Sequence, residues 1–354
     1  MELGWIRGSV LSGAVLASML LVAARTAAQN PGAVEGPSAS APQTTPPWAY
    51  PVAPPAAPGA AAAQAPQEDG TTKSVPGSSA AFTISQVRDA FNVADWHPGD
   101  HPAMPEVVVH GRRPDVRGCG YCHMPNGQGR PENSALAGLP AAYIVQQMAD
   151  FKNDLRKTSE PRMGPPNAMI AIGKAATDEE VKAAAQYFSS FKFKPWIRVV
   201  ESNTVPKTRI AGGMLAAAEP AATEPLGQRL IEMPEDLART DLRDPRSSFV
   251  AYVPPGSIKS GEELATTGGA RVVAGQIAPG KTIQCGICHG ADLRGLGNVP
   301  PIAGRSPSYT VRQLYDMQQG NRKGPGAELM KAVVANLSLD DMISIAAYTA
   351  SRVP

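Results

Sequence analysis

A short motif that occurs twice constrains this chain more than any other feature. The pattern C-G-x-C-H stands at residues 119–123 and returns 166 residues later at 285–289. Three further residues follow each copy at the same distances, so that Gly138, Tyr143 and Asp150 correspond to Gly304, Tyr309 and Asp316. Matched spacing of this kind predicts two homologous units within one chain.

The residues between these landmarks indicate helices in both units. Apolar residues follow each of the two tyrosines at helical spacing. A final helix is predicted to begin after Thr177 and after Ser338, because an acidic residue three positions later completes a capping box in each case. We also expect a helix before each motif, at 84–91 in the first unit and at 261–266 in the second.

The motif itself points to covalently bound haem. Two cysteines three positions apart lie on one side of a helical turn, where each thiol can add to one vinyl group of haem, and the adjacent imidazole then meets the iron. Two disulfides or a shared zinc site fit less well, because both copies end in histidine and belong to self-contained repeats. We therefore predict two haem c groups, attached through Cys119, Cys122, Cys285 and Cys288, with His123 and His289 as iron ligands.

Methionines are the candidates for the sixth iron ligand. Met169 lies eight residues before Thr177, and Met330 lies eight residues before Ser338. We predict these two as axial ligands, with Met163 as the alternative in the first unit. The remaining candidates, Met148, Met317 and Met342, fall on apolar helical faces and are expected to fill the core.

Three histidines precede the first motif in a proline-rich stretch. His97, His101 and His110 are expected to belong to a loop that packs against the haem edge. The alternative is that one of them replaces Met169 as the distal ligand, which would give the first haem two histidine ligands and a low potential.

Composition agrees with a cofactor-filled interior in an exported protein. Aromatic residues make up only 5% of the chain, which also holds 34 glycines and 35 prolines, so material for a core is scarce. Residues 1–28 read as a signal peptide, with an uncleaved anchor as the alternative. The net charge is only +2, and the sequence contains no cluster of basic residues. Nucleic acid is therefore not an expected partner. The expected location is the periplasm.

Composition and the repeat together predict five segments. The signal peptide at 1–28 precedes a disordered, Pro- and Ala-rich tether at 29–80, in which Trp48 and Tyr50 could make a local contact. The helical units occupy 81–198 and 249–354. The segment 199–248 between them has no clear periodicity and is expected to be irregular, although its apolar residues predict packing across one or both units.

The sequence resembles the class I c-type cytochromes, specifically the tandem dihaem group with two cytochrome c domains on one chain. The resemblance covers about residues 111–194 and 249–354. It implies an all-α fold with two tandem helical domains, and it implies the same cysteine, histidine and methionine roles. In that family a proline carbonyl orients the proximal histidine; Pro300 or Pro301 fits this place in the second unit, whereas the first unit has Ser134 there, with Pro131 nearby.

The function implied is transfer of single electrons between redox partner proteins. The alternative is a dihaem enzyme of the peroxidase or sulfur-compound dehydrogenase type, which needs one iron with a displaceable ligand. Two matched methionines favour the carrier, and no catalytic residues are predicted. Contact with a membrane is expected only through an uncleaved N-terminal anchor or a membrane-bound redox complex.

Overall fold

The computed structural model describes residues 45–53 and 70–354. The predicted signal peptide and most of the predicted tether lie outside these ranges. Within them, no helix is long and apolar enough to cross a membrane.

The first half, 81–198, is built around helices that bracket the first motif. The C-terminal helix of this half begins after Thr177, and the predicted capping box with Glu180 is formed. The helices are α1 (Ile84–Arg88), α2 (Glu106–Val109), α3 (Cys119–His123), α4 (Ala141–Lys152), α5 (Gly164–Ala175) and α6 (Asp178–Ser189), with a short 3-10 turn at Pro98–Asp100.

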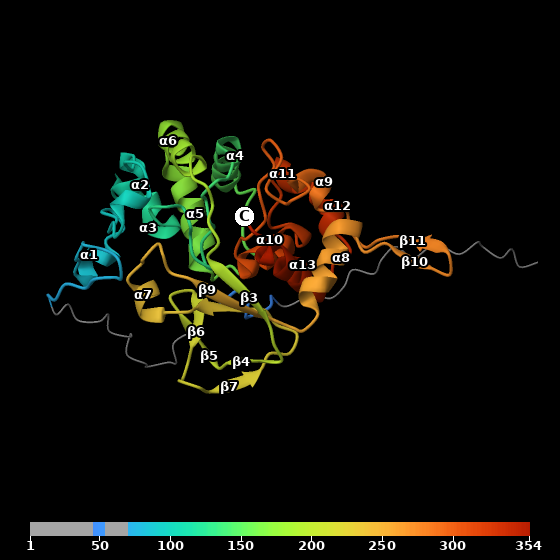
Figure 1. The fold of residues 1–354 in the computed structure, drawn as a ribbon. Coiled ribbons are helices and arrows are strands. Elements are labelled where there is room, and N and C mark those ends of the chain that lie inside the picture. Colours follow the sequence, from blue (N-terminus) through green and yellow to red (C-terminus); the bar gives the residue numbers. More distant parts are fainter. Residues whose placement is uncertain (1–44, 54–69) are drawn as a thin grey trace, which may run out of the picture. The chain divides into compact units, whose positions relative to one another are not determined.

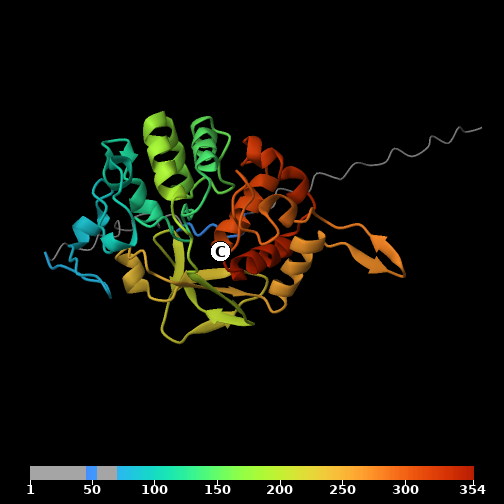
Figure 2. The ribbon, with the colours of Figure 1, turned by 45° about the horizontal axis from the view of Figure 1, so that its top comes forward.

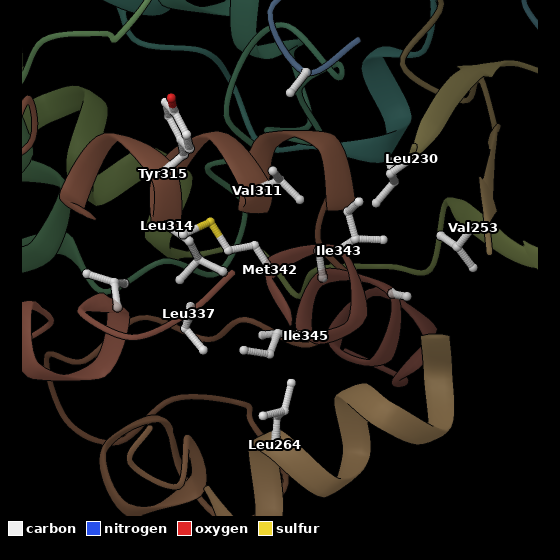
Figure 3. Packing of buried hydrophobic residues seen from close by; sticks show 14 of the residues in the cluster. Leu230, Val253, Leu264, Val311, Leu314, Tyr315, Leu337, Met342, Ile343 and Ile345 are labelled. Atoms are coloured by element: carbon white, nitrogen blue, oxygen red, sulfur yellow. The ribbon is translucent and has the colours of Figure 1, made fainter. Parts of the chain in front are cut away.

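The second half, 249–354, repeats this plan. Its last helix starts after Ser338, again with the predicted capping box. Leu264 points from the first helix of this half toward Ile345 on the last, within a core that also contains Leu314 and Met342 (Figure 3). The helices are α8 (Ser257–Thr267), α9 (Gly286–His289), α10 (Pro307–Gln318), α11 (Pro325–Glu328), α12 (Lys331–Val334) and α13 (Leu339–Ser351).

The helix that precedes each motif differs between the halves. In the second half, α8 contains the expected stretch 261–266 and packs on α13. In the first half, the expected stretch 84–91 forms only α1, whose Val87 packs with Trp96 instead of the C-terminal helix. The one-turn helix α2 takes the place against α6, through Val107 and Val108. The expected helix before the first motif is thus present over Ile84–Arg88, shorter than predicted, and a second short helix that was not predicted makes the contact with α6.

The connecting segment corrects the prediction of an all-α chain. Residues 199–248 are not irregular, because they form most of a small β structure that lies beside helices of both halves (Figure 1). Strand β9 pairs in parallel with β3 and antiparallel with β8. The strands are β3 (Ile197–Glu201), β4 (Thr204–Pro206), β5 (Thr208–Ala211), β6 (Met214–Ala217), β7 (Thr223–Pro225), β8 (Ile231–Pro234) and β9 (Phe249–Val253), with helix α7 (Leu237–Asp241).

This β structure has a core of its own. Leu226 and Ile231 are fully buried and pack with Val205 and Val250. Leu230 instead joins the core of the second half. Packing of the apolar residues of this segment, predicted from the sequence, is thus found in the structure, whereas its strands were missed.

Two hairpins precede the motifs. Strands β1 (Gly111–Arg112) and β2 (Val116–Arg117) lead into the first motif, and β10 (Arg271–Val273) and β11 (Gln276–Ala278) stand before the second. The β10–β11 hairpin extends away from the helices in both views (Figures 1 and 2).

Part of the predicted tether is packed. Tyr50 is 2% exposed, and its hydroxyl donates a hydrogen bond of 2.7 Å to Asp316 on α10. Arg312 donates to the carbonyl of Ala49 at 2.8 Å. Val75 is likewise buried beside Trp96, so the prediction of a disordered tether is wrong for residues 45–53 and for residues 70–80.

Candidate haem sites

A cavity of about 500 Å³ lies beside the first motif. It is lined by Cys119, Cys122 and His123 from α3, and by apolar side chains from α4, α5 and α6. Its volume falls within the range of about 300–1,000 Å³ that is typical of small-molecule and cofactor sites. Along α5, only Gly173 is buried, so the apolar side chains of this helix that line the cavity are left for a bound group to cover. The cavity therefore fits a haem held by the first motif.

Both histidines that are predicted to ligate iron contact a backbone carbonyl. Nδ1 of His123 lies 2.8 Å from the carbonyl oxygen of Ser134, and Nδ1 of His289 lies 2.7 Å from that of Pro300. The family contact expected at Pro300 or Pro301 is thus made by Pro300. Ser134 serves equally well because the acceptor is main-chain oxygen, and in both halves this contact leaves Nε2 for iron.

The two imidazoles are held in the neutral form that binds metal. Burial lowers the pKa of His123, and although the hydrogen bond to Ser134 opposes this effect, the guanidinium of Arg156 lowers the pKa further. In the second half, burial lowers the pKa of His289, the bond to Pro300 opposes it, and Arg322 adds to the lowering. Neutral imidazole is the form that ligates iron.

The methionines of the first half lie in different surroundings. Met169 stands on α5 and lines the same cavity as His123. Met163 is 2% exposed and belongs to the core of the second half, away from this lining. Met148 lines the cavity, so the expectation that it only fills the core was wrong, whereas Met317 and Met342 do pack in the core of the second half.

The second site is more open. The predicted ligand Met330 precedes α12 and packs partly against the core of the second half. Apolar side chains near the motif and near Met330 are exposed to an extent that is unusual for their type: Ile283 at 43%, Leu296 at 61% and Leu329 at 79%. A bound porphyrin would bury such a lining, so these residues also fit the group.

The three other histidines have partners outside the cavity. Nε2 of His97 lies 3.0 Å from Asp244 of the connecting segment. His101 contacts Asp95 at 3.1 Å, and His110 lies 3.3 Å from the carbonyl of Phe91. None of the three is among the described residues that line the cavity.

Burial favours the neutral thiol form of three of the four cysteines, Cys119, Cys122 and Cys285. Burial raises the pKa of Cys119 to about 12 and that of Cys285 to about 11. Zinc binds thiolates, so this environment does not favour the zinc alternative. Within the described part of the chain, no group of three or more His, Cys, Asp or Glu side chains could hold a metal ion.

Six buried or partly buried polar residues join the two halves with approximate twofold symmetry. Arg156 donates to Tyr309 at 2.7 Å and to Gln313 at 3.0 Å. Arg322 donates to the residues that correspond to these two in the repeat, Tyr143 and Gln147, each at 2.8 Å. We call this set the interface cluster: Tyr143, Gln147, Arg156, Tyr309, Gln313 and Arg322.

The interface cluster contains two buried guanidinium groups that form no ion pair with a described residue. Arg156 and Arg322 are each 8% exposed. Burial lowers the pKa of Arg322, but Tyr143, Tyr309 and the carboxylate of Asp150, which is not bonded to this arginine, raise the pKa overall. Nε of Arg322 has no hydrogen-bond partner among the described residues. Buried unpaired cations are costly, so an anionic group is expected nearby, and haem propionates have the required charge. Neither arginine was predicted from the sequence, although their separation of 166 residues matches the repeat.

Removing one member of the interface cluster should weaken the whole protein. In Arg156→Ala, the hydroxyl of Tyr309 and the amide oxygen of Gln313 lose a donor, and we expect the free energy of unfolding to fall by about 2 kcal/mol. Denaturant unfolding of the holoprotein measures this change. Arg113→Ala is the control, because this side chain is 67% exposed, and the change should stay within about 0.5 kcal/mol. Equal stability of the two variants would contradict a structural role for the cluster.

Comparison with known proteins decides the family. A sequence profile described as "Cytochrome c" matches residues 115–192. Cytochrome c-554(548) of Halomonas halodenitrificans is 38% identical over 82 residues, which are 22% of this chain and 99% of that protein. The chain belongs to the cytochrome c family. With a second C-x-x-C-H motif in a tandem repeat, this cytochrome carries two haem c groups.

Two further relatives match over longer parts of this chain. Cytochrome c4 of Stutzerimonas stutzeri is 32% identical to this cytochrome over 148 residues, covering 38% of the chain and 65% of that relative. The thiosulfate dehydrogenase electron acceptor of Stutzerimonas stutzeri strain A1501 is 25% identical over 244 residues, covering 68% of the chain and 82% of that protein.

Proposed function

We propose that this protein is a periplasmic dihaem cytochrome c that passes single electrons between redox partner proteins. In this proposal His123 and Met169 ligate the first iron, and His289 and Met330 ligate the second. The bound haem supplies the reversible one-electron change, while the chain supplies ligands, burial and an electrostatic environment.

The interface cluster carries this proposal. It bonds the two halves directly, and each of its arginines is close enough to a proximal histidine to lower that pKa, Arg156 for His123 and Arg322 for His289. These contacts support the proposal, because a carrier that moves electrons within itself requires its two redox sites to be joined in a fixed arrangement. A haem enzyme needs an open iron position, which the presence of Met169 in the first cavity does not favour.

The class of partner follows from the relatives. One of them is named as the electron acceptor of a thiosulfate dehydrogenase. We propose that the donor to this cytochrome is likewise a periplasmic dehydrogenase, and that the acceptor is a further redox protein or a membrane-bound redox complex.

Paired cysteine variants test both the cofactors and the function. After denaturation, the mature protein should retain the mass of two haems, and Cys119→Ala/Cys122→Ala and Cys285→Ala/Cys288→Ala should each retain one, because thioether bonds survive unfolding. A redox titration should show two reversible one-electron steps in the wild type and one in each variant. Loss of all pigment to acidified organic solvent, or turnover of peroxide or thiosulfate well above that of free haem, would overturn the proposal.

A further inference from the structure

A short piece of the connecting segment is fastened across the first half. We call residues 242–247, which follow α7, the strap. Its main chain accepts hydrogen bonds from Trp96 to Leu242 at 2.7 Å, from Asn126 to Pro245 at 3.1 Å and from Gln128 to Ser247 at 2.8 Å. The strap is therefore anchored to the first half on both sides of the motif.

Two side-chain pairs add to this anchoring. Asp244, which is 2% exposed, contacts His97 at 3.0 Å. Arg246 forms a two-pronged ion pair with Asp100, with both distances at 2.7 Å. The proline-rich stretch before the motif thus holds the strap. This role was not predicted from the sequence.

The strap places Arg243 at the first cavity. Its guanidinium lies 3.8 Å from the centre of the Tyr121 ring and donates to the carbonyl of Tyr121 at 2.7 Å. Arg243 lines the cavity together with Cys122. Its backbone is left-handed, with φ at 56°, a conformation that persists where surrounding contacts enforce it.

The position of Tyr121 tells which edge of the haem is covered. The two vinyl groups that receive the thiols stand on the side of the porphyrin opposite the two propionates. Tyr121 lies between the two cysteines of the motif, so a side chain stacked on Tyr121 and lining the cavity with Cys122 lies along the thioether edge. A haem held by the first motif would therefore have the strap along its thioether edge.

The second motif is open at the corresponding positions. Ile287 corresponds to Tyr121 in the repeat and is 62% exposed. Cys288 is exposed, whereas Cys122 is partly buried. His289 is partly buried, whereas His123 is only 6% exposed. The protein around the second motif therefore covers it less than the protein around the first motif does.

We propose that the strap closes the thioether edge of the first haem, so that electrons enter and leave the protein through the second haem. The inference rests on the proposed carrier function. One electron leaves the second site for an external oxidant, which is reduced by one electron, and one electron then follows from the first site across the interface cluster.

Solvent access to each haem tests the proposal without any turnover. In proton NMR of the oxidised holoprotein, a soluble gadolinium chelate broadens haem methyl resonances that are near solvent. We expect the methyl resonances of one haem to broaden at least about threefold more than those of the other. Ile287→Glu should change the chemical shifts of the strongly broadened methyl resonances, and Arg243→Gln should change those of the weakly broadened, protected set. These changes assign each set of resonances to one haem. Equal broadening of the two sets in the wild type would overturn the proposal.

Variants that loosen the strap provide the second arm. Arg246→Ala and Asp100→Ala should each raise the broadening of the protected set to within about twofold of the other. Arg198→Ala is the matched control, because it breaks an ion pair of 2.8 Å with Glu235 in the same segment but outside the strap, and it should leave the pattern unchanged. Persistence of full protection in both strap variants would show that the strap is not the cover.

Electron exchange with an inorganic reagent supplies the kinetic arm. When the reduced holoprotein is mixed with excess ferricyanide, we expect one phase whose rate rises with oxidant concentration and one that levels off. Ile287→Glu should slow the concentration-dependent phase by about threefold through repulsion of the anion, and Val272→Glu, on the β10–β11 hairpin, should not. Two concentration-dependent phases in the wild type would refute this inference alone, whereas no exchange at either haem would refute the carrier proposal itself.

Discussion

Changing Met169 to alanine is expected to remove the far-red sulfur-to-iron absorption band of one haem, and changing Met330 to alanine is expected to remove that of the other. Met169 lines the cavity that also contains His123, so its thioether is available to the first iron. Met169→His should lower the potential of that haem by on the order of 0.2 V, because a thioether favours ferrous iron more than imidazole does and axial ligands span a range of about 0.8 V. Absorption spectra and a spectrally resolved redox titration measure both effects.

Met163→Ala tests whether Met163 ligates iron or only stabilises the fold. Met163 is 2% exposed in the core of the second half, so its truncation should cost about 2–5 kcal/mol of stability while both bands remain. Loss of a band in this variant would move the ligand assignment to Met163. Unchanged spectra in both Met169→Ala and Met330→Ala would refute the proposed ligand pair.

Gly261→Ala is expected to destabilise the second half by about 3 kcal/mol. A Cβ at Gly261 would lie 1.9 Å from the carbonyl oxygen of Ser344 and 2.8 Å from Cβ of Tyr348. Both atoms belong to α13, so α8 and α13 would have to separate. Denaturant unfolding of the holoprotein measures the loss.

The control for this change is Gly326→Ala in α11. No atom lies within 4 Å of a Cβ built at Gly326, and alanine favours a helix more than glycine does, so stability should hold or rise by up to about 1 kcal/mol. Similar destabilisation by the two changes would contradict close packing of α8 on α13 as the cause.

The repeat carried most of what the sequence could predict. The capping boxes at Thr177 and Ser338 were predicted because a cap is local, depending on residues three positions apart. The carbonyl contact to His123 was not predicted, because Ser134 stands where the family has proline, yet Ser134 makes the contact through its main-chain oxygen.

The features that were missed depend on contacts between distant segments. Strand β3 pairs with β9 across 52 positions, a separation at which neither strand carries a local signal of its partner. Arg243 reaches Tyr121 from 122 positions away, and nothing in its immediate sequence marks it as a cavity residue. The one-turn helix α2 was missed because four residues are too few to show a helical period.

The parallel pairing of β3 with β9 has a consequence for how such a protein can change. Ile197 to Glu201 leave the first half in register with Phe249 to Val253, which enter the second. The chain leaves the first half and enters the second along two paired strands. The excursion, residues 202–248, therefore begins and ends at the same place in the fold. Because Leu230 packs in the core of the second half and the strap is bonded to the first, the excursion also holds both redox units, and only its exposed turns can be lengthened or exchanged without disturbing them.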